Sequence, residues 1–257
     1  MAVIEQLQSK QSAGQLVINH YSEIGYCYDN LYGGFSSAVI SVISRQLQFS
    51  STETVLDIGG GTGEIGHLLS KKYSLQAPVI CVDPVESMLE IAKKKEGIET
   101  VLATAEKFFS SKESKGKTFS RILVIRCYHH FKDPALVFEG VARMLTQDGV
   151  CLLLCTTPDS APLLFQKARQ LFQFVDYPKI VKLVESQGLR ARWISDHEKR
   201  MLAKEDCFSF LRNRGYSSLS SFTDDEIEDG IKELDEQYKD NTIEAVYTFN
   251  IVIITKY

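Results

Sequence analysis

The sequence predicts an α/β fold in which a doubly wound, mostly parallel sheet carries helices on both faces. Three observations support this prediction. Between residues 55 and 156, strand-like runs alternate strictly with helix-like segments, which is the order of consecutive βαβ units. The strand-like runs are almost continuously apolar, as expected for strands that are covered on both faces. A glycine-rich turn joins the first of these strands to the helix that follows it.

The expected strands of this alternating region are 55–58, 77–83, 98–103, 121–125 and 150–155. Helices are expected between them, and the helix after the fourth strand has a clear start. Asp133 is a good N-cap residue, and Pro134 suits the first helical position because its missing N–H is not needed there.

Two helices are also expected before the first strand, a short amphipathic one within 2–19 and one over 36–47 with a single apolar face. Between them lies a segment dense in aromatic residues, 21–35. The aromatic rings can simply pack together. Alternatively they form a lid over a ligand, because aromatic faces attract cations. The sequence leaves both readings open.

The alternation ends at Pro158. Two helices without a strand between them, 161–174 and 178–186, are interpreted as a cap over the strand ends. A sixth strand (188–202), a helix (204–214), a capping box that starts another helix at Thr223, and a last strand (245–255) complete the expected chain.

The bulk composition is that of an ordinary globular protein of 257 residues, enough for one large domain with an inserted cap. The net charge of −4 offers no strong basic field to nucleic acid. No signal peptide is visible, and no apolar run approaches the ~20 residues of a membrane span. The six cysteines include no C-x-x-C pair. We therefore expect a cytoplasmic protein with reduced thiols.

The most informative stretch is VLDIGGGTGEIG, residues 55–66. Glycines permit a tight turn close to a ligand, and the following helix start presents free N–H groups. Asp57 is unusual inside a buried strand. Residues 61–66 fit the dinucleotide fingerprint G-x-G-x-x-G, and Asp83 follows Gly63 by 20 residues, the spacing that brings a carboxylate to a ribose.

The larger pattern D-x-G-x-G-x-G, over residues 57–63, resembles motif I of the class I S-adenosylmethionine-dependent methyltransferases. The resemblance implies a Rossmann-like, seven-stranded sheet whose last strand is antiparallel. It also implies one methyltransferase domain, divided into an N-terminal helical lid (1–49), a cofactor-binding core (50–158), cap helices (159–187) and the C-terminal part of the sheet (188–257).

In this family, the glycines that match Gly59, Gly61 and Gly63 pass under the methionine part of S-adenosylmethionine. The resemblance implies that Asp57 orders this loop and the ligand's ammonium group, and that Asp83 accepts hydrogen bonds from the ribose hydroxyls. The adenine side has a further set of implied residues, in which Thr104 replaces an Asp of many relatives: Pro84, Met88, Thr104, Ala105 and Glu106.

Residues 128–133 resemble the HHF-x-D signature of the small-molecule branch called methyltransferase type 11, which includes ubiquinone- and menaquinone-pathway relatives. His129 is the candidate general base, Tyr128 or Tyr21 an orienting group, and Arg126 a residue close to both cofactor and methyl group. His130 is interpreted mainly as a structural histidine under the sheet.

The predicted activity is methyl transfer to an O, N, S or C atom of a small, partly apolar acceptor. A closed pocket is expected from the aromatic N-terminal segment, the loop after the fourth strand and the cap. Its predicted acceptor-binding residues are Tyr21, Tyr26, Tyr28, His129 and Thr156.

Two rival functions remain open: an NAD(P)-dependent oxidoreductase, and a catalytically inactive methyltransferase-like binding subunit. No D/N-P-P-Y/F box follows the fourth strand, which disfavours nucleic-acid base methylation, and no metal-ligand cluster is apparent. An arsenite-type site would need Cys27, Cys127 and Cys207 to meet, which their spacing cannot show. The sequence does not resolve monomer from dimer.

Overall fold

The computed structural model describes residues 18–25, 28–112, 114–156, 164–171 and 175–257. Seven strands form one sheet in the order β3-β2-β1-β4-β5-β7-β6. Their bounds are β1 Val55–Ile58, β2 Val79–Asp83, β3 Ile98–Leu102, β4 Phe119–Ile125, β5 Leu145–Thr156, β6 Arg190–Ala203 and β7 Thr242–Thr255. All pairings among β1 to β5 are parallel, and β7 pairs antiparallel with both β5 and β6. The predicted doubly wound, Rossmann-like sheet with an antiparallel last strand is confirmed.

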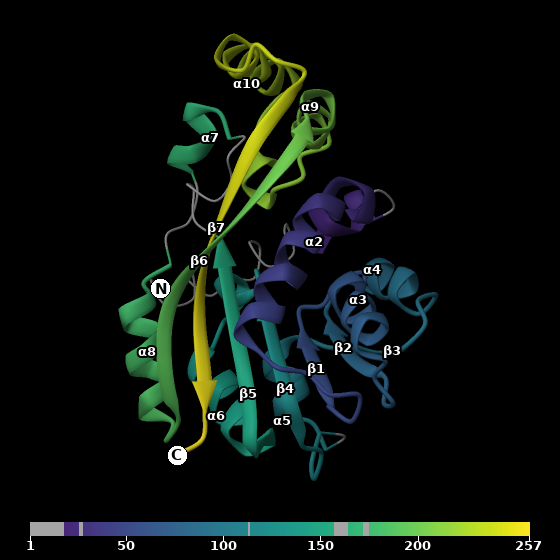
Figure 1. Ribbon diagram of the computed structural model, residues 1–257, viewed down its shortest axis with the longest axis vertical. Coiled ribbons are helices and arrows are strands. Elements are labelled where there is room, and N and C mark those ends of the chain that lie inside the picture. The colour runs from purple at the N-terminus through teal and green to yellow at the C-terminus, as the bar shows by residue number, and fades with distance from the viewer. Residues whose placement is uncertain (1–17, 26–27, 113, 157–163, 172–174) are drawn as a thin grey trace, which may run out of the picture.

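Helices cover both faces of this sheet (Figure 1). One face packs against α2 (Tyr28–Gln46), α3 (Glu64–Tyr73) and α4 (Glu86–Ala92). The other packs against α5 (Ala105–Ser110), α6 (Pro134–Met144) and α8 (Tyr177–Ser186). Successive strand residues point to opposite faces of the sheet. Val55 is buried under α2 and α3, whereas Leu56 is buried under α5, α6 and α8. The helix start predicted at Asp133 is confirmed, because its side chain accepts a hydrogen bond from the Leu136 N–H at 3.2 Å.

The helix expected over 36–47 begins earlier than predicted, at Tyr28. The first turns of α2 therefore include part of the aromatic segment. Phe35 packs against Tyr247 and Phe249 of β7, each with ring centroids 5.7 Å apart. Tertiary packing of this kind outweighs the weak helical pattern around the two glycines that precede Phe35. Of the helix expected within 2–19, the structure describes only the end: residues 18–24 are helical.

A second correction concerns the expected cap helices. α8 does not lie over the strand ends. It packs along the sheet, and its residues Tyr177, Ile180 and Val184 are buried in the same core as α6. Without α8, β6 and β7 would leave an apolar face bare at that side of the sheet. Of the residues predicted as cap, Phe165 and α7 (Gln166–Gln170) do pack in a helical cluster outside the sheet.

The actual cap is a helical cluster at the far end of the long strands β6 and β7 (Figure 1). We call it the helical cap. It contains α7, α9 (Lys204–Arg212), the 3-10 turn η4 (Ser217–Leu219) and α10 (Asp224–Gln237), and it has its own apolar core. The predicted capping box is confirmed, since Thr223 and Glu226 bond each other's backbone N–H groups.

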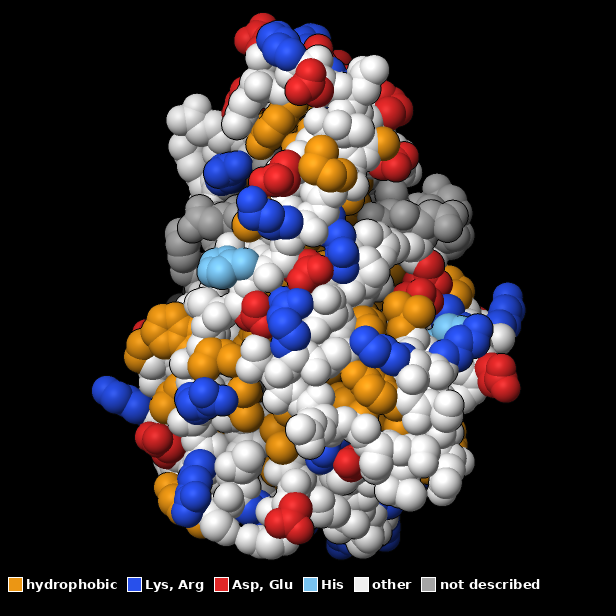
Figure 2. All heavy atoms as spheres, in the orientation of Figure 1, with side chains coloured by type: hydrophobic (Ala, Val, Ile, Leu, Met, Phe, Trp, Pro, Cys, Tyr) orange, Lys and Arg blue, Asp and Glu red, His pale blue; other side chains and the backbone are white. Residues whose placement is uncertain are grey.

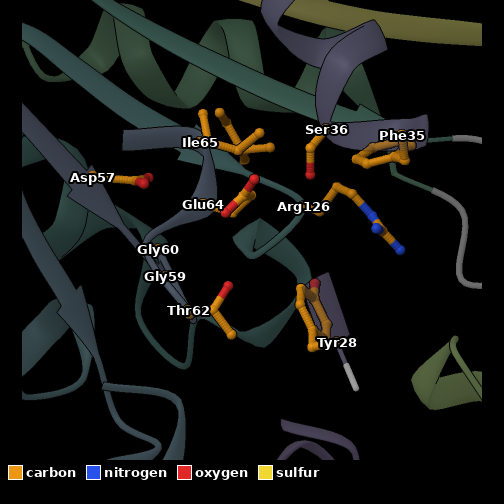
Figure 3. A pocket seen from close by; sticks show the side chains of 12 residues that line it. Tyr28, Phe35, Ser36, Asp57, Gly59, Gly60, Thr62, Glu64, Ile65 and Arg126 are labelled. Atoms are coloured by element: carbon orange, nitrogen blue, oxygen red, sulfur yellow. The ribbon is translucent and has the colours of Figure 1, made fainter. Parts of the chain in front are cut away.

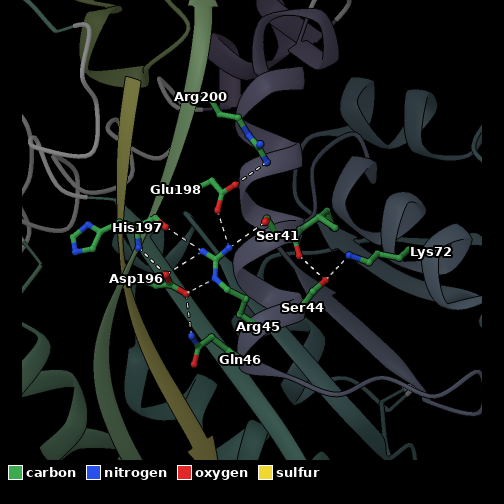
Figure 4. A network of polar contacts seen from close by, with 10 residues as sticks. Ser41, Ser44, Arg45, Gln46, Lys72, Asp196, His197, Glu198 and Arg200 are labelled. Carbon is green, nitrogen blue, oxygen red and sulfur yellow. Dashed lines mark hydrogen bonds and ion pairs between the residues drawn. The ribbon is translucent and has the colours of Figure 1, made fainter. Parts of the chain in front are cut away.

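A polar network fixes α2 against β6 (Figure 4). The Arg45 guanidinium donates to Asp196 at 3.0 Å and to Glu198 at 2.7 Å, and Gln46 also donates to Asp196 at 3.0 Å. Both carboxylates are mostly buried, at 17% and 14% exposed, whereas Arg45 is 41% exposed. Partial burial and several shared partners make this network stronger than a lone surface ion pair. The C-terminal half of α2 is thereby tied to the sheet.

On the face shown in Figure 2, positive, negative and hydrophobic side chains are interspersed. None of the helices in the described part of the chain is long and apolar enough to span a membrane. The five described cysteines are free and buried, and Cys27 lies outside the described residues. Cys127 and Cys207 belong to different core clusters.

Candidate active site

The glycine loop between β1 and α3 has the backbone conformation that its sequence predicts. Gly59, Gly61 and Gly63 adopt left-handed φ angles of 69°, 56° and 71°. Such angles are strained for residues with a side chain. At Gly59 a side chain is excluded by contact as well, because a Cβ would lie 2.5 Å from the Cβ of Cys127. Around Gly61 nothing lies within 4 Å of that position, so this glycine faces open space.

A small cavity of about 60 Å³ lies over the loop at the carboxyl edge of the sheet (Figure 3). Its walls come from β1, the glycine loop, the start of α3, the end of β4 and the first half of α2. The lining residues are Tyr28, Phe35, Ser36, Asp57, Gly59, Gly60, Gly61, Thr62, Glu64, Ile65, Ile125 and Arg126. Pockets for small ligands usually enclose roughly 300–1,000 Å³. A nucleotide-sized ligand therefore requires the side chains at the mouth to move apart.

Asp57 is the buried acid of this cavity. Its side chain is 2% exposed, and its Oδ2 atom has no hydrogen-bond partner among the described residues. Burial, with a smaller contribution from the Asp83 charge, raises the pKa of Asp57 to about 7. A buried carboxylate oxygen without a partner is costly, and a cationic ligand group would remove that cost. The position thus suits a ligand ammonium.

Asp83 stands at the end of β2 and holds the loop from the side. Its Oδ2 accepts the Gly61 N–H at 3.0 Å, and its Oδ1 accepts the Val85 N–H at 2.8 Å. Burial raises the pKa of Asp83 to about 6, while these two backbone hydrogen bonds oppose the rise. Each oxygen keeps a further lone pair, so the carboxylate can still accept hydrogen bonds from a ligand.

The predicted adenine-side residues differ in exposure and in hydrogen bonding, and none of them lines the cavity. Pro84 is exposed, Met88 is buried in α4, and Ala105 is buried at the start of α5. Thr104 caps α5, because its hydroxyl accepts the Lys107 N–H at 3.3 Å. Glu106 accepts the backbone N–H of Lys132 at 2.7 Å, so its carboxylate holds the loop that precedes α6.

Arg126 follows β4 and connects three parts of the chain. It lines the cavity, and its backbone has a left-handed φ of 56°, which is uncommon for a residue with a side chain. Its guanidinium carbon lies 4.5 Å from the ring centre of Phe35 in α2 and 5.4 Å from that of Tyr216 in the helical cap. Strained residues are concentrated at functional sites. No sequence pattern indicated that Tyr216 would be part of this contact.

The 3-10 turn η2 (Tyr128–His130) places its three side chains differently. The Tyr128 ring stacks on Phe138, with centroids 6.2 Å apart, and thus points into the core; burial raises its pKa. The rings of His129 and His130 lie 3.9 Å apart. Desolvation, the neighbouring His130 and the Arg126 charge lower the pKa of His129, whose side chain is still exposed to solvent. Burial and Arg126 lower the pKa of His130 to about 4.

The N-terminal aromatic residues meet both the cavity and η2. Tyr28 lines the cavity. The Tyr21 ring lies edge-on to Tyr28 at 6.1 Å and to His130 at 6.2 Å between centroids. Tyr26 and the side chain of Thr156 lie outside the described residues, so their predicted roles stay predictions.

Sequence reasoning missed a polar latch between α2 and the loop. Asp29 accepts a hydrogen bond from the Thr62 hydroxyl at 2.5 Å and another from Lys95 at 2.6 Å. Lys95 also pairs with Glu64, the first residue of α3, at 2.7 Å. Each partner is ordinary in its own segment, so no local pattern could reveal the contact.

Comparison with known proteins agrees with this geometry. A family model described as "Methyltransferase domain" matches residues 55–149, from β1 into the first part of β5. The region from β1 into β5 is thus similar to a methyltransferase domain.

The curated proteins that this chain matches are distant relatives. A ubiquinone/menaquinone biosynthesis C-methyltransferase of Desulfotalea psychrophila is 26% identical over 166 residues, which cover 63% of this chain and 65% of the relative. A malonyl-[acyl-carrier protein] O-methyltransferase of Bacillus anthracis is 23% identical over 163 residues, which cover 63% of this chain and 58% of the relative. The matches therefore span less than two thirds of either relative.

Solved methyltransferase structures share the fold. A methyltransferase from an antibiotic biosynthesis pathway of Anabaena variabilis aligns with a TM-score of 0.60 at 21% identity, covering 85% of this chain and 96% of that one. Phosphoethanolamine N-methyltransferase 2 of Haemonchus contortus, in complex with S-adenosylhomocysteine, aligns with a TM-score of 0.58 at 16% identity, covering 90% and 56%.

Proposed function

We propose that this chain transfers a methyl group from S-adenosylmethionine to a small-molecule acceptor. The observation that supports this best is the convergence of the left-handed glycine loop and the unpartnered Asp57 oxygen at one cavity, with Asp83 hydrogen-bonded to Gly61 of that loop. These residues suit the cofactor: the glycines leave room above the loop, Asp57 would bind its ammonium group and Asp83 its ribose. When bound, S-adenosylmethionine supplies a methyl group on a positively charged, electrophilic sulfur.

The contribution of the protein is mainly positioning and the exclusion of water. The glycine loop would set the cofactor's position, and Tyr28 and Phe35 of α2 would cover it. Arg126 lies between Phe35 and Tyr216, so it can orient an acceptor at the point where α2 and the helical cap meet.

An acceptor that carries a proton needs a base. We propose His129 for this role, because it stands three residues from the cavity-lining Arg126 and its side chain is exposed to solvent. Tyr128 would act through the position of η2, since its ring packs on Phe138. On the adenine side, Pro84, Met88 and Ala105 would provide apolar contact, and Thr104 and Glu106 would hold the surrounding backbone.

We also propose that the whole chain works as a single methyltransferase domain. β6 and β7 complete the sheet that β1 to β5 begin, and the helical cap lies at the ends of the same two strands. Residues 1–49 would act as the lid. The acceptor would be partly apolar, in keeping with the aromatic side chains around the cavity.

Calorimetry of the purified chain tests the proposal. S-adenosylhomocysteine should bind with micromolar affinity, about −8 kcal/mol, and NADH should not bind. Asp83→Ala should weaken binding by about 1.5–3 kcal/mol, the value of hydrogen bonds to a charged group. Asp148→Ala, at an exposed position of β5, is the matched control.

Methyl transfer itself is then measured with radiolabelled S-adenosylmethionine and a panel of O, N, S and C acceptors, with and without EDTA. Binding of NADH but not of S-adenosylhomocysteine would show the oxidoreductase alternative to be correct. Cofactor binding without transfer to any acceptor would favour an inactive binding subunit. The named relatives include C-, O- and N-methyltransferases, which is why the panel spans these atoms.

A further inference from the structure

Two buried histidine nitrogens lack hydrogen-bond partners among the described residues. They are the Nε2 atoms of His20 and His130, which come from segments 110 positions apart in the chain. His20 is only 6% exposed. Buried polar atoms are nearly always hydrogen-bonded, and an unpaired one costs free energy. Two such atoms in one neighbourhood indicate a place where a ligand supplies the partners.

The two histidines share one neighbourhood. The Tyr21 ring lies against both of them, with centroids 5.0 Å from His20 and 6.2 Å from His130. The charge of His20 acts on the titration of His130. The charges of Glu23 and Arg214 act on His20 in turn, so it lies near the segment that leads into η4 of the helical cap. The pair therefore sits where the N-terminal helix, η2 and the cap come together.

The side chains of this neighbourhood contact the wall of the cavity over the glycine loop. Tyr21 contacts Tyr28, which lines the cavity, and the Arg126 charge, also at the cavity wall, acts on His130. A molecule that reaches past Tyr28 and Arg126 from the cavity would meet the two imidazoles next. The acceptor side of the site therefore has a polar end inside an aromatic surround.

The chemistry of the pair limits what it can bind. Burial lowers the pKa of both histidines, and Arg126 lowers that of His130 further, so both imidazoles are neutral at pH 7. A neutral imidazole has one N–H donor and one acceptor nitrogen. Two neutral rings can thus offer a donor and an acceptor to the same group. A hydroxyl uses both, whereas a carbonyl or an ether uses only the donor. An ammonium ion would be repelled by Arg126.

We propose that His20 and His130 form a hydroxyl-binding subsite that positions the methyl acceptor, so that the acceptor carries a hydroxyl group on an aromatic or otherwise apolar frame. This inference rests on the proposed methyltransferase function. Both histidines are positioning residues here: they hold the hydroxyl while Arg126 stabilises negative charge that develops on its oxygen. Among the described residues, the other charged and titratable neighbours include Glu23, Arg214 and His129.

The test uses the full chain saturated with S-adenosylhomocysteine, and two probes of nearly equal shape, p-cresol and toluene. Nitrogen-15 spectra of the histidine side chains report on each ring nitrogen separately. We expect p-cresol to shift the Nε2 signals of His20 and His130, and not those of His197, which lies on β6 beside the α2 network (Figure 4). We also expect p-cresol to bind at least tenfold more tightly than toluene.

The variants His20→Phe and His130→Phe separate a ligand subsite from ordinary packing. If the nitrogens are unpaired without ligand, an apolar ring of similar size should leave the Tm unchanged or raise it, and the preference for p-cresol over toluene should disappear. His197→Phe is the matched control. A fall in Tm of several degrees in both variants would mean that these nitrogens have structural partners, and would overturn the proposal.

Equal binding of p-cresol and toluene by the wild-type protein would overturn it as well. Calorimetry with S-adenosylhomocysteine is done first on every variant. Absence of cofactor binding to the wild type refutes the proposed function itself, whereas intact cofactor binding without a hydroxyl preference refutes only the subsite.

Discussion

Replacement of Asp57 by asparagine should stabilise the ligand-free protein at pH 8 while it weakens cofactor binding. The pKa of Asp57 is about 7 in the folded chain, against an ordinary value of 3.8. The fold thus binds this proton more tightly than the unfolded chain does. The free energy of unfolding therefore falls as pH rises from about 4 to about 7. This pKa difference corresponds to about 4 kcal/mol.

The asparagine side chain of the Asp57→Asn variant cannot ionise, so the stability of the variant does not fall in this way as the pH rises. Its amide nitrogen would take the place of an oxygen that has no partner, which costs about 1–3 kcal/mol. The expected net gain at pH 8 is about 2 kcal/mol, or a rise in Tm of about 4–8 °C for a chain of this size. At pH 5, where Asp57 is protonated, the same replacement should be neutral or slightly destabilising.

The assay is thermal unfolding by circular dichroism at pH 5 and pH 8, with the exposed Asp148→Asn as control, followed by calorimetry with S-adenosylhomocysteine. Affinity should fall by about 10- to 150-fold, the loss of one charged hydrogen-bond partner. A variant that loses stability equally at both pH values would refute the assignment of Asp57 as an unpaired buried acid. Unchanged affinity would refute its role at the ligand ammonium.

The same geometry leads to three further predictions. Affinity for S-adenosylhomocysteine should rise about tenfold between pH 5.5 and pH 7.5, because Asp57 and Asp83 lose protons in that range, with pKa values of about 7 and about 6. A ligand α-amino group, with a pKa of about 8, stays charged over the same range. A flat affinity profile in calorimetry would contradict this prediction, and Asp57→Asn should flatten the profile. Asp29→Ala should speed dissociation of S-adenosylhomocysteine about tenfold in stopped-flow measurements, because the hydrogen bonds from Thr62 and Lys95 to Asp29 are lost. Thr62→Val should show a smaller effect. Unchanged dissociation rates would mean that these contacts do not close the site. Gly59→Ala should destabilise the fold by about 2–4 kcal/mol in urea unfolding, because the new Cβ would lie against Cys127. Gly61→Ala should cost only about 1 kcal/mol, because there only the left-handed φ is unfavourable. Equal losses of stability would show that the left-handed φ alone determines the cost.

Much of the glycine-loop side of the candidate site could be predicted from the sequence, because its signals are local. The glycine loop, the Asp57 that precedes it and the caps at Asp133 and Thr223 each depend on backbone chemistry within a few residues. The alternation of apolar runs likewise predicted the parallel part of the sheet. Only the position of Asp83 needed a longer spacing, and the length of one βαβ unit supplied it.

Tertiary structure alone decided the contacts that α2, η2 and the helical cap make around the candidate site. The Asp29–Thr62 bond joins residues 33 apart, and the Asp29–Lys95 bond joins residues 66 apart. No periodicity connects such residues, because the contact exists only once α2 has packed across the loop. The same holds for Arg126 between Phe35 and Tyr216, and for His20 near His130.

The position of α8 shows the same limit. Its apolar stripe predicts a buried helix face but does not say which surface buries it. α8 packs on the sheet rather than in the cap because β6 and β7 leave an apolar face there that α8 buries. Sequence patterns of 2 and 3.6 residues report which side of an element is apolar, whereas the partner of that side depends on the free energy of the whole packed chain.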